Sequence, residues 1–306
     1  MSLKIIFMGT SSFSIPTLNF LIKNQYNIVQ VYSQPSKKSN RGQKINFSPV
    51  HKFAQENNLQ TRTPERLDDD KEYSFINNLS ADLAVVVAYG QLIPKRFLET
   101  TKLGFFNIHA SLLPKWRGAA PIQRSIMNRD KRTGVCIMKI EEKLDAGPVL
   151  SSLELMLNPQ TTSGELEKKL SEAGGNLLIE VLPKIINGTA KFLQQDHSKA
   201  TYAKKISKAE CKINWNSDMD QIVYKIHALN PKPGAWFEYK KQRFKVWKAI
   251  KSSTSGKPGT ILDENLTVAC KSGSIQILEI QREGKNKQQT KDFLLGTKIS
   301  KNSILI

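Results

Sequence analysis

The first 190 residues alternate between short apolar runs and segments with helical spacing, and this alternation restricts the possible folds more than any other feature. The apolar runs at 4–8, 28–32 and 83–88 have the length of buried strands. Helical segments separate such runs, and the longest begins at Ser163 and ends near Leu182. Repeated strand–helix units predict an α/β domain with a Rossmann-like, mainly parallel sheet and helices on both faces.

The other elements expected in this part follow from the same patterns. Helices are predicted at 50–56, 71–79 and 122–128, and strands at 105–109, 135–140 and 149–157. Ser14 is expected to cap a helix that carries Pro16 in its first turn.

After a polar connection at about 187–207, the pattern changes. One helix is predicted at 219–229, and short alternating runs follow at 235–239, 244–249, 259–262, 266–269 and 274–281. Several short strands separated by turn residues predict a small antiparallel β-barrel of the OB type. We therefore expect a first domain at 1–188, a linker at 189–206 and a basic barrel domain at 207–306.

The charge of the chain points to a polyanionic partner. The net charge is +19, and residues 201–306 alone hold 20 basic and 9 acidic residues, a net charge of +11. An excess of this size is typical of proteins that bind nucleic acid. Composition by itself leaves tRNA, DNA and an anionic membrane surface open.

Other features of the composition narrow the class of protein. The longest apolar run, 83–88, is far shorter than a membrane span, and residues 1–8 do not resemble a secretory leader, so we expect a cytoplasmic protein. Cys136, Cys211 and Cys270 are isolated in the sequence, which argues against a disulfide framework and a zinc site. A monomer is expected.

The segment 105–114 carries the strongest chemical signal. Alternate side chains of a strand point to one face, so Asn107 and His109 are expected to lie together at the carboxyl end of their strand. Open α/β sheets place their active sites at that end. An amide donor beside an imidazole can stabilise a developing oxyanion and move a proton. Taken singly, each residue would more often be structural.

A third polar group follows in the segment 139–149. Asp145 precedes Gly147 and Pro148, and seen alone it would more often be an acid that begins a turn. From the residues alone, its participation in catalysis stays open.

Several motifs together resemble the formyltetrahydrofolate-dependent formyltransferase family. Asn-Ile-His at 107–109 with Ser-Leu-Leu-Pro at 111–114 resembles the family's signature, and 115–122 is most similar to its methionyl-tRNA branch. Segments 144–149 and 85–94, and Gly9-Thr10 with Phe13, are similar to further motifs of the family. The resemblance covers residues 4 to about 250.

The resemblance implies a catalytic site and a folate site. Asn107 and His109 would donate to the oxyanion that forms when an amine attacks the formyl carbon, and Asp145 would orient and stabilise His109 and help to relay the proton. The donor would be 10-formyltetrahydrofolate, with no metal. The expected folate-binding residues are Ser111, Leu112, Leu113, Pro114, Tyr89, Gly90, Gln91, Leu92 and Ile93.

A long basic loop favours tRNA as the acceptor. Residues 33–52 contain five basic and no acidic residues, and an α/β unit needs only a few residues for such a connection. The resemblance implies an arm that grips the acceptor end of initiator methionyl-tRNA, with Arg41 at its key basic position. We expect the loop to be mobile without tRNA. The expected tRNA-binding residues are Lys37, Lys38, Arg41, Lys44, Lys205, Lys208 and Lys245.

Aromatic residues interleave with the basic residues of the second domain. Strand alternation predicts that Trp236, Phe237, Phe244 and Trp247 lie in the barrel core while the charges form an outer platform for tRNA.

Three alternatives remain open from the sequence. The same site would suit a formyltransferase for a small amine, such as an aminosugar nucleotide or a purine precursor. The basic loop and the basic second domain argue against this alternative, because a purine-precursor enzyme would have little use for such a domain. The site would also suit a hydrolase that releases formate from the folate. A non-catalytic tRNA-binding protein is the third alternative, and the presence of all three catalytic residues argues against it. The first turn, Gly9-Thr10-Ser11-Ser12-Phe13, lacks the nucleotide-binding glycine motifs, which argues against a nicotinamide or ATP enzyme.

Overall fold

The computed structural model describes residues 3–39, 44–297 and 299–306, and the chain forms two compact units. The first unit comprises Met1–Gly118, Thr133–Leu155 and Glu167–Tyr202, and the second comprises Ala119–Arg132, Met156–Leu166 and Ala203–Ile306. The units interleave along the chain and do not correspond to one cut in the sequence. The boundaries at 188 and 207 stay a prediction.

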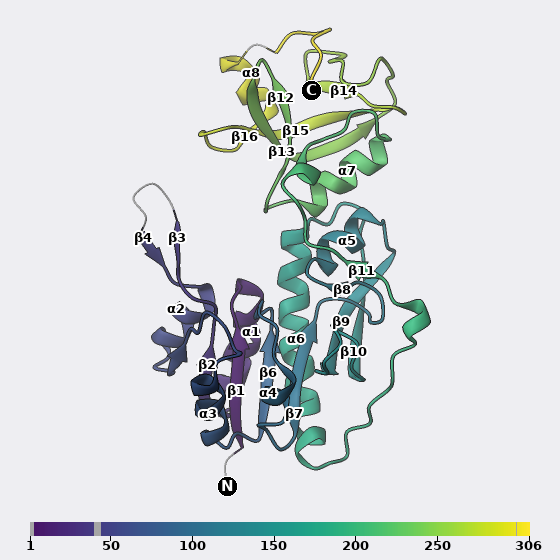
Figure 1. The fold of residues 1–306 in the computed structure, drawn as a ribbon. Coiled ribbons are helices and arrows are strands. Elements are labelled where there is room, and N and C mark those ends of the chain that lie inside the picture. Colours follow the sequence, from purple (N-terminus) through teal and green to yellow (C-terminus); the bar gives the residue numbers. More distant parts are fainter. Residues whose placement is uncertain (1–2, 40–43, 298) are drawn as a thin grey trace. The chain divides into compact units, whose positions relative to one another are not determined.

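A seven-stranded sheet forms the centre of the first unit, with strand order β10-β9-β7-β6-β1-β2-β5. The strands are β1 (Lys4–Gly9), β2 (Asn27–Tyr32), β5 (Thr61–Arg62), β6 (Leu83–Val87), β7 (Gly104–His109), β9 (Arg132–Lys139) and β10 (Val149–Met156). Strands β2, β1, β6 and β7 lie side by side and parallel (Figure 1). β9 runs antiparallel to β7.

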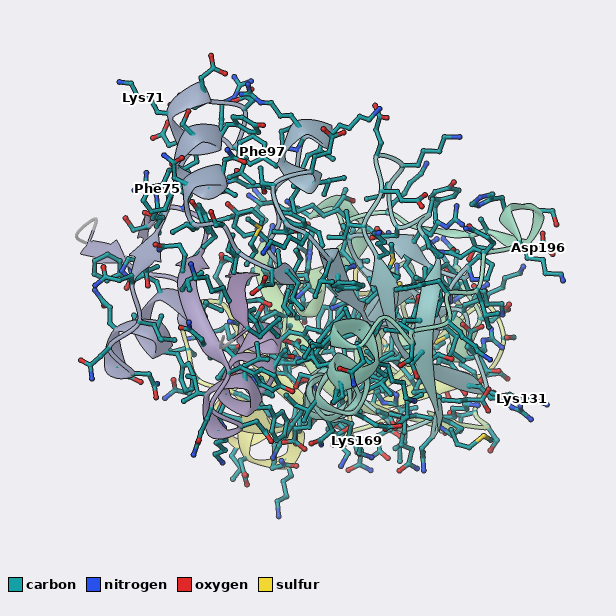
Figure 2. The ribbon with its side chains drawn as sticks, turned by 90° about the horizontal axis from the view of Figure 1, so that it is seen from below. Lys71, Phe75, Phe97, Lys131, Lys169 and Asp196 are labelled. Carbon is teal, nitrogen blue, oxygen red and sulfur yellow. The ribbon has the colours of Figure 1, made fainter. Side chains whose placement is uncertain are left out.

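Helices cover both faces of this sheet. They are α1 (Ile15–Lys23), α2 (Pro49–Glu56), α3 (Asp70–Asn78), α4 (Lys95–Leu98) and α6 (Ser163–Ile186), and the short strands β8 (Arg117–Gly118) and β11 (Tyr202–Ala203) lie outside the sheet. Helices α3, with Lys71 and Phe75, and α4, with Phe97, lie side by side (Figure 2).

Alternation along β7 decides which helices each residue meets. Phe105 lies in an apolar cluster with Ile76 of α3 and Phe97 of α4. Ile108 points the other way, where α6 comes so close that a Cβ on Gly174 would lie 2.6 Å from Cγ2 of Ile108. Asn107 and His109 are separated from Phe105 by even numbers of residues, so they share its face.

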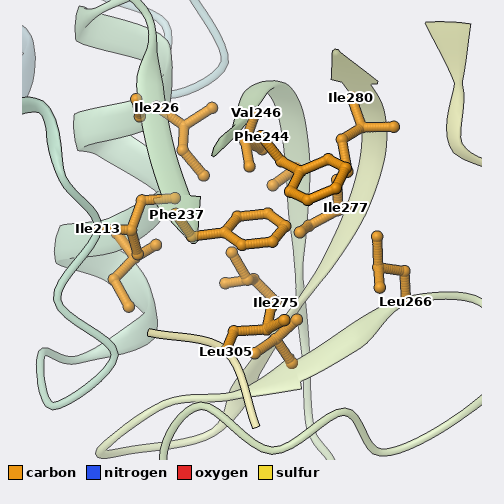
Figure 3. Close-up of a cluster of buried hydrophobic side chains, with 14 of the residues drawn as sticks. Ile213, Ile226, Phe237, Phe244, Val246, Leu266, Ile275, Ile277, Ile280 and Leu305 are labelled. Carbon is orange, nitrogen blue, oxygen red and sulfur yellow. The ribbon is translucent and has the colours of Figure 1, made fainter. Parts of the chain in front are cut away.

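The second unit contains a curled antiparallel sheet with strand order β12-β13-β15-β14, and β16 pairs with β15. Its elements are α5 (Pro121–Met127), α7 (Met219–Ala228), β12 (Ala235–Tyr239), β13 (Gln242–Ser252), β14 (Thr267–Ala269), β15 (Ser274–Arg282), β16 (Gln288–Gln289) and α8 (Thr290–Gly296). Figure 3 shows the core, where the rings of Phe237 and Phe244 stack with centroids 5.5 Å apart. Ile226 of α7 and Leu305 belong to the same cluster.

The end of the chain bridges the open side of this sheet. Ile306 exchanges two backbone hydrogen bonds with Glu238 of β12, of 2.7 and 2.9 Å. Ile304 forms a bridge with Thr260, and Ile261 forms one with Val268 of β14. The segments near 260 and 304 therefore link β14 to β12 and complete a barrel-like ring. The fold class predicted from the sequence is confirmed.

Three local expectations need correction. Ser14 stands at the N-cap position of α1, but its side chain makes no capping hydrogen bond, because its buried hydroxyl donates to Val87 O at 2.6 Å. Residues 259–262 form single bridges and no regular strand. Residues 37–39 and 44–46 of the expected loop pair as a hairpin, β3 (Lys37–Ser39) with β4 (Lys44–Asn46). These strands are three residues long and have no apolar alternation from which they could have been predicted.

Candidate active site

The sheet edge at the end of β7 carries the candidate catalytic residues. In β7, Asn107 pairs with Met138 and His109 with Cys136 of the antiparallel neighbour β9. Asn107 is half-buried, and His109 is buried. Asp145 lies beyond the end of β9, in the turn that leads into β10.

His109 and Asp145 come together in the structure. Nδ1 of His109 lies 3.7 Å from Oδ2 of Asp145, and both side chains are largely shielded from water. Nε2 of His109 lies 2.9 Å from the carbonyl oxygen of Trp116. A carbonyl can only accept, so this hydrogen bond requires a proton on Nε2. In the neutral ring Nδ1 then faces the carboxylate without a proton and can take one up.

The backbone around Asp145 is held in an uncommon conformation. Its φ is +47°, in the left-handed region, and its Oδ2 accepts a hydrogen bond of 2.7 Å from the amide of Gly118. Two residues later, a Cβ on Gly147 would lie 2.0 Å from the carbonyl oxygen of Lys139, which leaves room only for glycine. The turn thus directs the carboxylate of Asp145 toward His109.

Sequence reasoning missed two buried residues beside this turn, Arg117 and Gln195. The amide nitrogen of Gln195 donates to the carbonyl oxygens of Asp145 and Gly147, and its oxygen accepts from Arg117. Gln195 is 78 residues from Arg117 in the sequence, and no local pattern indicates a contact over that distance. A buried arginine would have been a signal, but its burial becomes visible only in the fold.

The candidate folate-binding residues differ in what they expose. Leu92 and Gly90 are exposed, and Gln91, Leu112, Leu113 and Pro114 are partly exposed. Tyr89 and Ile93 are buried in the apolar cluster beneath their loop. Ser111 is fully buried, and its hydroxyl donates to Lys115 O at 2.6 Å. The buried side chains of Tyr89, Ile93 and Ser111 support the two loops, whereas the other candidate residues are accessible to a ligand.

The loop at 88–94 presents its backbone to solvent at a position where glycine is favoured. Gly90 has a φ of +82°, and its carbonyl oxygen accepts from Nε2 of Gln34 at 2.7 Å. The preceding carbonyl, of Tyr89, accepts from the hydroxyl of Thr10 at 2.7 Å. The first turn of the chain and this loop are therefore tied together at one edge of the sheet.

The candidate tRNA-binding residues lie in both units. Lys37, Lys38 and Lys44 belong to the β3–β4 hairpin, while Arg41 lies outside the described residues. Lys205 and Lys208 are exposed. Lys245 is partly buried and donates to Pro233 O at 2.8 Å.

The aromatic residues of the second unit follow the expectation with one exception. Phe237, Phe244 and Trp247 are buried. Trp236 is only half-buried, and the guanidinium of Arg243 lies 4.0 Å from its ring centroid. One aromatic face on the outside of the barrel is therefore covered by a cation.

The described residues contain neither a metal-binding cluster nor a membrane-spanning helix. No group of three or more histidine, cysteine, aspartate or glutamate side chains there could hold a metal ion. No helix within these ranges is long and apolar enough to span a bilayer.

Comparison with known proteins gives the family. A model of the formyl transferase family matches residues 3–182, and a model of the formyl transferase C-terminal domain matches residues 205–298. The methionyl-tRNA formyltransferase of Pelagibacter ubique is 47% identical over 99% of this chain and 98% of its own length. That of Chelativorans sp. is 41% identical over the whole of both chains.

Solved structures share the fold at low sequence identity. The sugar 3N-formyl transferase WlaRD, solved in the presence of dTDP and 5-N-formyl-THF, has a TM-score of 0.67 and 22% identity, over 94% of this chain and all of its own. HypX from Aquifex aeolicus, in complex with tetrahydrofolic acid, has a TM-score of 0.68 and 17% identity, over 96% of this chain and 47% of its own. From the two family models and the full-length relatives, the chain belongs to the formyl transferase family, in its methionyl-tRNA formyltransferase branch.

Proposed function

We propose that this protein transfers the formyl group of 10-formyltetrahydrofolate to the amino group of methionine on initiator methionyl-tRNA, for the initiation of translation. The observation that carries the proposal is the 3.7 Å contact between His109 and Asp145. His109 lies two residues after Asn107 in β7, and the chain is similar over its full length to methionyl-tRNA formyltransferases.

The reaction exchanges one carbon–nitrogen bond for another. The methionine nitrogen attacks the formyl carbon, and the carbonyl oxygen becomes an oxyanion. Asn107 donates to this oxygen, and His109 donates to it when its Nε2–H turns from the carbonyl of Trp116 to the oxyanion; such donors are worth about 3–4 kcal/mol each. The bond from carbon to N10 of the folate then breaks, and the proton lost by the amine is returned to N10.

Asp145 supports this proton transfer through His109. Its carboxylate faces Nδ1, so it attracts the positive charge that develops on the ring when the ring takes up the amine's proton. The hydrogen bond from the amide of Gly118 fixes the carboxylate in place. Acid–base help of this kind contributes roughly 100- to 10,000-fold in rate.

The folate would bind between the loops at 88–94 and 111–114. A pterin needs apolar contact and a few backbone partners. Leu92, Leu112 and Leu113 offer apolar surface, and Gly90 is exposed while its carbonyl oxygen accepts from Gln34. The buried Tyr89 and Ser111 would keep the two loops in shape.

The tRNA would contact the β3–β4 hairpin with Arg41 and the basic residues of the second unit. Lysine and arginine contacts to phosphate give affinity that falls as salt rises. The cation-covered face of Trp236 suits the same polyanion, since Arg243 can bind phosphate while its guanidinium rests on the ring. We further propose that the protein acts as a monomer in the cytoplasm.

Formylation of charged initiator tRNA tests the function, with a pyrimidine-nucleotide aminosugar as the competing acceptor. We expect formyl-methionyl-tRNA to form, and His109→Ala to abolish it without loss of tRNA binding. Arg41→Ala should weaken tRNA affinity and flatten its dependence on salt. Transfer to the aminosugar in preference to the tRNA, or release of formate without an acceptor, would overturn the proposal.

A further inference from the structure

The residues on either side of Arg117 touch both acid–base groups of the site. The carbonyl oxygen of Trp116 accepts from Nε2 of His109 at 2.9 Å, and the amide of Gly118 donates to Oδ2 of Asp145 at 2.7 Å. The backbone of Arg117 therefore connects Trp116, which binds His109, to Gly118, which binds Asp145.

The side chain of Arg117 is buried, with 4% of its surface exposed. Its Nε and Nη2 donate to Oε1 of Gln195 at 3.1 and 2.6 Å, and Nη2 lies 2.9 Å from Nδ1 of His197. A buried guanidinium is tolerated only when its N–H groups have partners. These contacts fix Arg117 from the side-chain end.

Gln195 connects Arg117 to the turn that carries Asp145. Its Nε2 donates to the carbonyl oxygen of Asp145 at 2.9 Å and to that of Gly147 at 2.7 Å. One amide group thus holds the turn at two points. The turn contains Asp145, whose left-handed backbone is a conformation that residues other than glycine seldom adopt. Both ends of Gln195 are committed, one to each loop of the site.

The segment that follows Gln195, up to Thr201, also contacts the loop at 116–118. Thr201 accepts from the amide of Trp116 through its hydroxyl and from the amide of Arg117 through its carbonyl, both at 2.9 Å. The neighbours of Gln195 point outward instead. Gln194 and Asp196 are exposed, and Asp196 lies at the rim of the molecule in Figure 2.

We propose that Arg117 and Gln195 are positioning residues for formyl transfer, which set the carboxylate of Asp145 against the ring of His109. The segment 195–201, expected from the sequence to be part of a linker, would then be part of the catalytic framework. This inference rests on the proposed function for its kinetic test, and on the geometry alone for its spectroscopic test.

The kinetic test compares Gln195→Ala with Gln194→Ala, which removes the same side chain from an exposed neighbour. A displacement of about 1 Å at a reacting group can cost about 100-fold in rate. We expect Gln195→Ala to lower kcat by about 10- to 100-fold while KM for the folate and for the tRNA stays as in the wild type. Gln195→Glu keeps the acceptor for Arg117 and loses the donor to the turn, so its kcat should fall as well.

A double-mutant cycle separates positioning from simple loss of stability. If Gln195 acts through Asp145, Gln195→Ala should have almost no further effect on kcat once Asp145→Asn is present. Rates are normalised to the folded fraction measured by circular dichroism. Equal effects of Gln195→Ala in both backgrounds would overturn the inference, as would a Gln195→Ala enzyme with wild-type kcat.

The spectroscopic test needs no substrate. Among the 17 glycines, the amide of Gly118 reports directly on its hydrogen bond to Asp145. In protein labelled with [15N]glycine, Asp145→Asn identifies the Gly118 signal and shows the effect of losing the carboxylate. We expect Gln195→Ala to move that signal toward the Asp145→Asn position and Gln194→Ala to leave it unchanged. A signal unmoved by Gln195→Ala would refute the inference even if no formyl transfer were found.

Discussion

Replacing Asp145 with asparagine removes one charge from the site and keeps the shape of the side chain. The carboxylate oxygen lies 3.7 Å from Nδ1 of His109. At an effective dielectric constant of about 20, a carboxylate and an imidazolium at this separation attract each other by about 4 kcal/mol. If that attraction is present only when His109 is protonated in the transition state, its loss corresponds to about 1000-fold in rate.

The measured loss should be somewhat smaller, because the amide oxygen of asparagine still accepts from Gly118 and still points its dipole at the ring. We therefore expect kcat for formyl transfer to fall about 100- to 1000-fold, with little change in KM. The matched control is Glu142→Gln, which neutralises an exposed carboxylate in the same segment and should leave kcat unchanged. An Asp145→Asn enzyme within about threefold of the wild type would refute the role assigned to this carboxylate.

Three further predictions concern packing within the two units. Gly147→Ala should lower both Tm and kcat, because its Cβ would lie 2.0 Å from Lys139 O; an unchanged Tm in a thermal scan would contradict the close approach. Phe237→Ala should lower the free energy of unfolding, measured in urea, by about 3–5 kcal/mol. Leu295→Ala, at an exposed position, should leave this free energy nearly unchanged. Similar losses in both variants would contradict the assignment of Phe237 to the core. Burial raises the pKa of the Cys136 thiol from its ordinary value of 9.0 to about 11, so the unfolded chain releases this proton first and stability should fall as pH rises from about 9 to about 11. A Cys136→Ala protein should show a shallower fall, and a pH profile identical to that of the wild type would contradict the prediction.

Much of the fold could be predicted because its signals are local. The run at Leu83–Val87 is apolar throughout and is a fully buried central strand. The separation of two residues between Asn107 and His109 placed both on one face of a strand, as the structure has them. The three-residue strands at 37–39 and 44–46 have no such signal, since their pairing depends on backbone hydrogen bonds and not on an apolar face.

Contacts between distant segments could not be read from the sequence. Ser14 is at the N-cap position of α1, as its residue type indicated, but its hydroxyl donates to the carbonyl oxygen of Val87 at the end of β6 and not to the helix. Gln195 resembles any polar residue of a linker until the fold places it between Arg117 and Asp145. The role of Asp145 was recognised only through the resemblance to a family, because β8, α5 and β9 separate it from His109 along the chain.

The most direct test of the account is a single-turnover reaction with formyl-labelled 10-formyltetrahydrofolate and methionine-charged initiator tRNA. We predict that the label appears on methionyl-tRNA in step with the release of tetrahydrofolate, and that His109→Ala and Asn107→Ala both suppress the transfer while the charged tRNA still binds. Label that appears as free formate, or tRNA that remains unformylated while the folate is consumed, would contradict it.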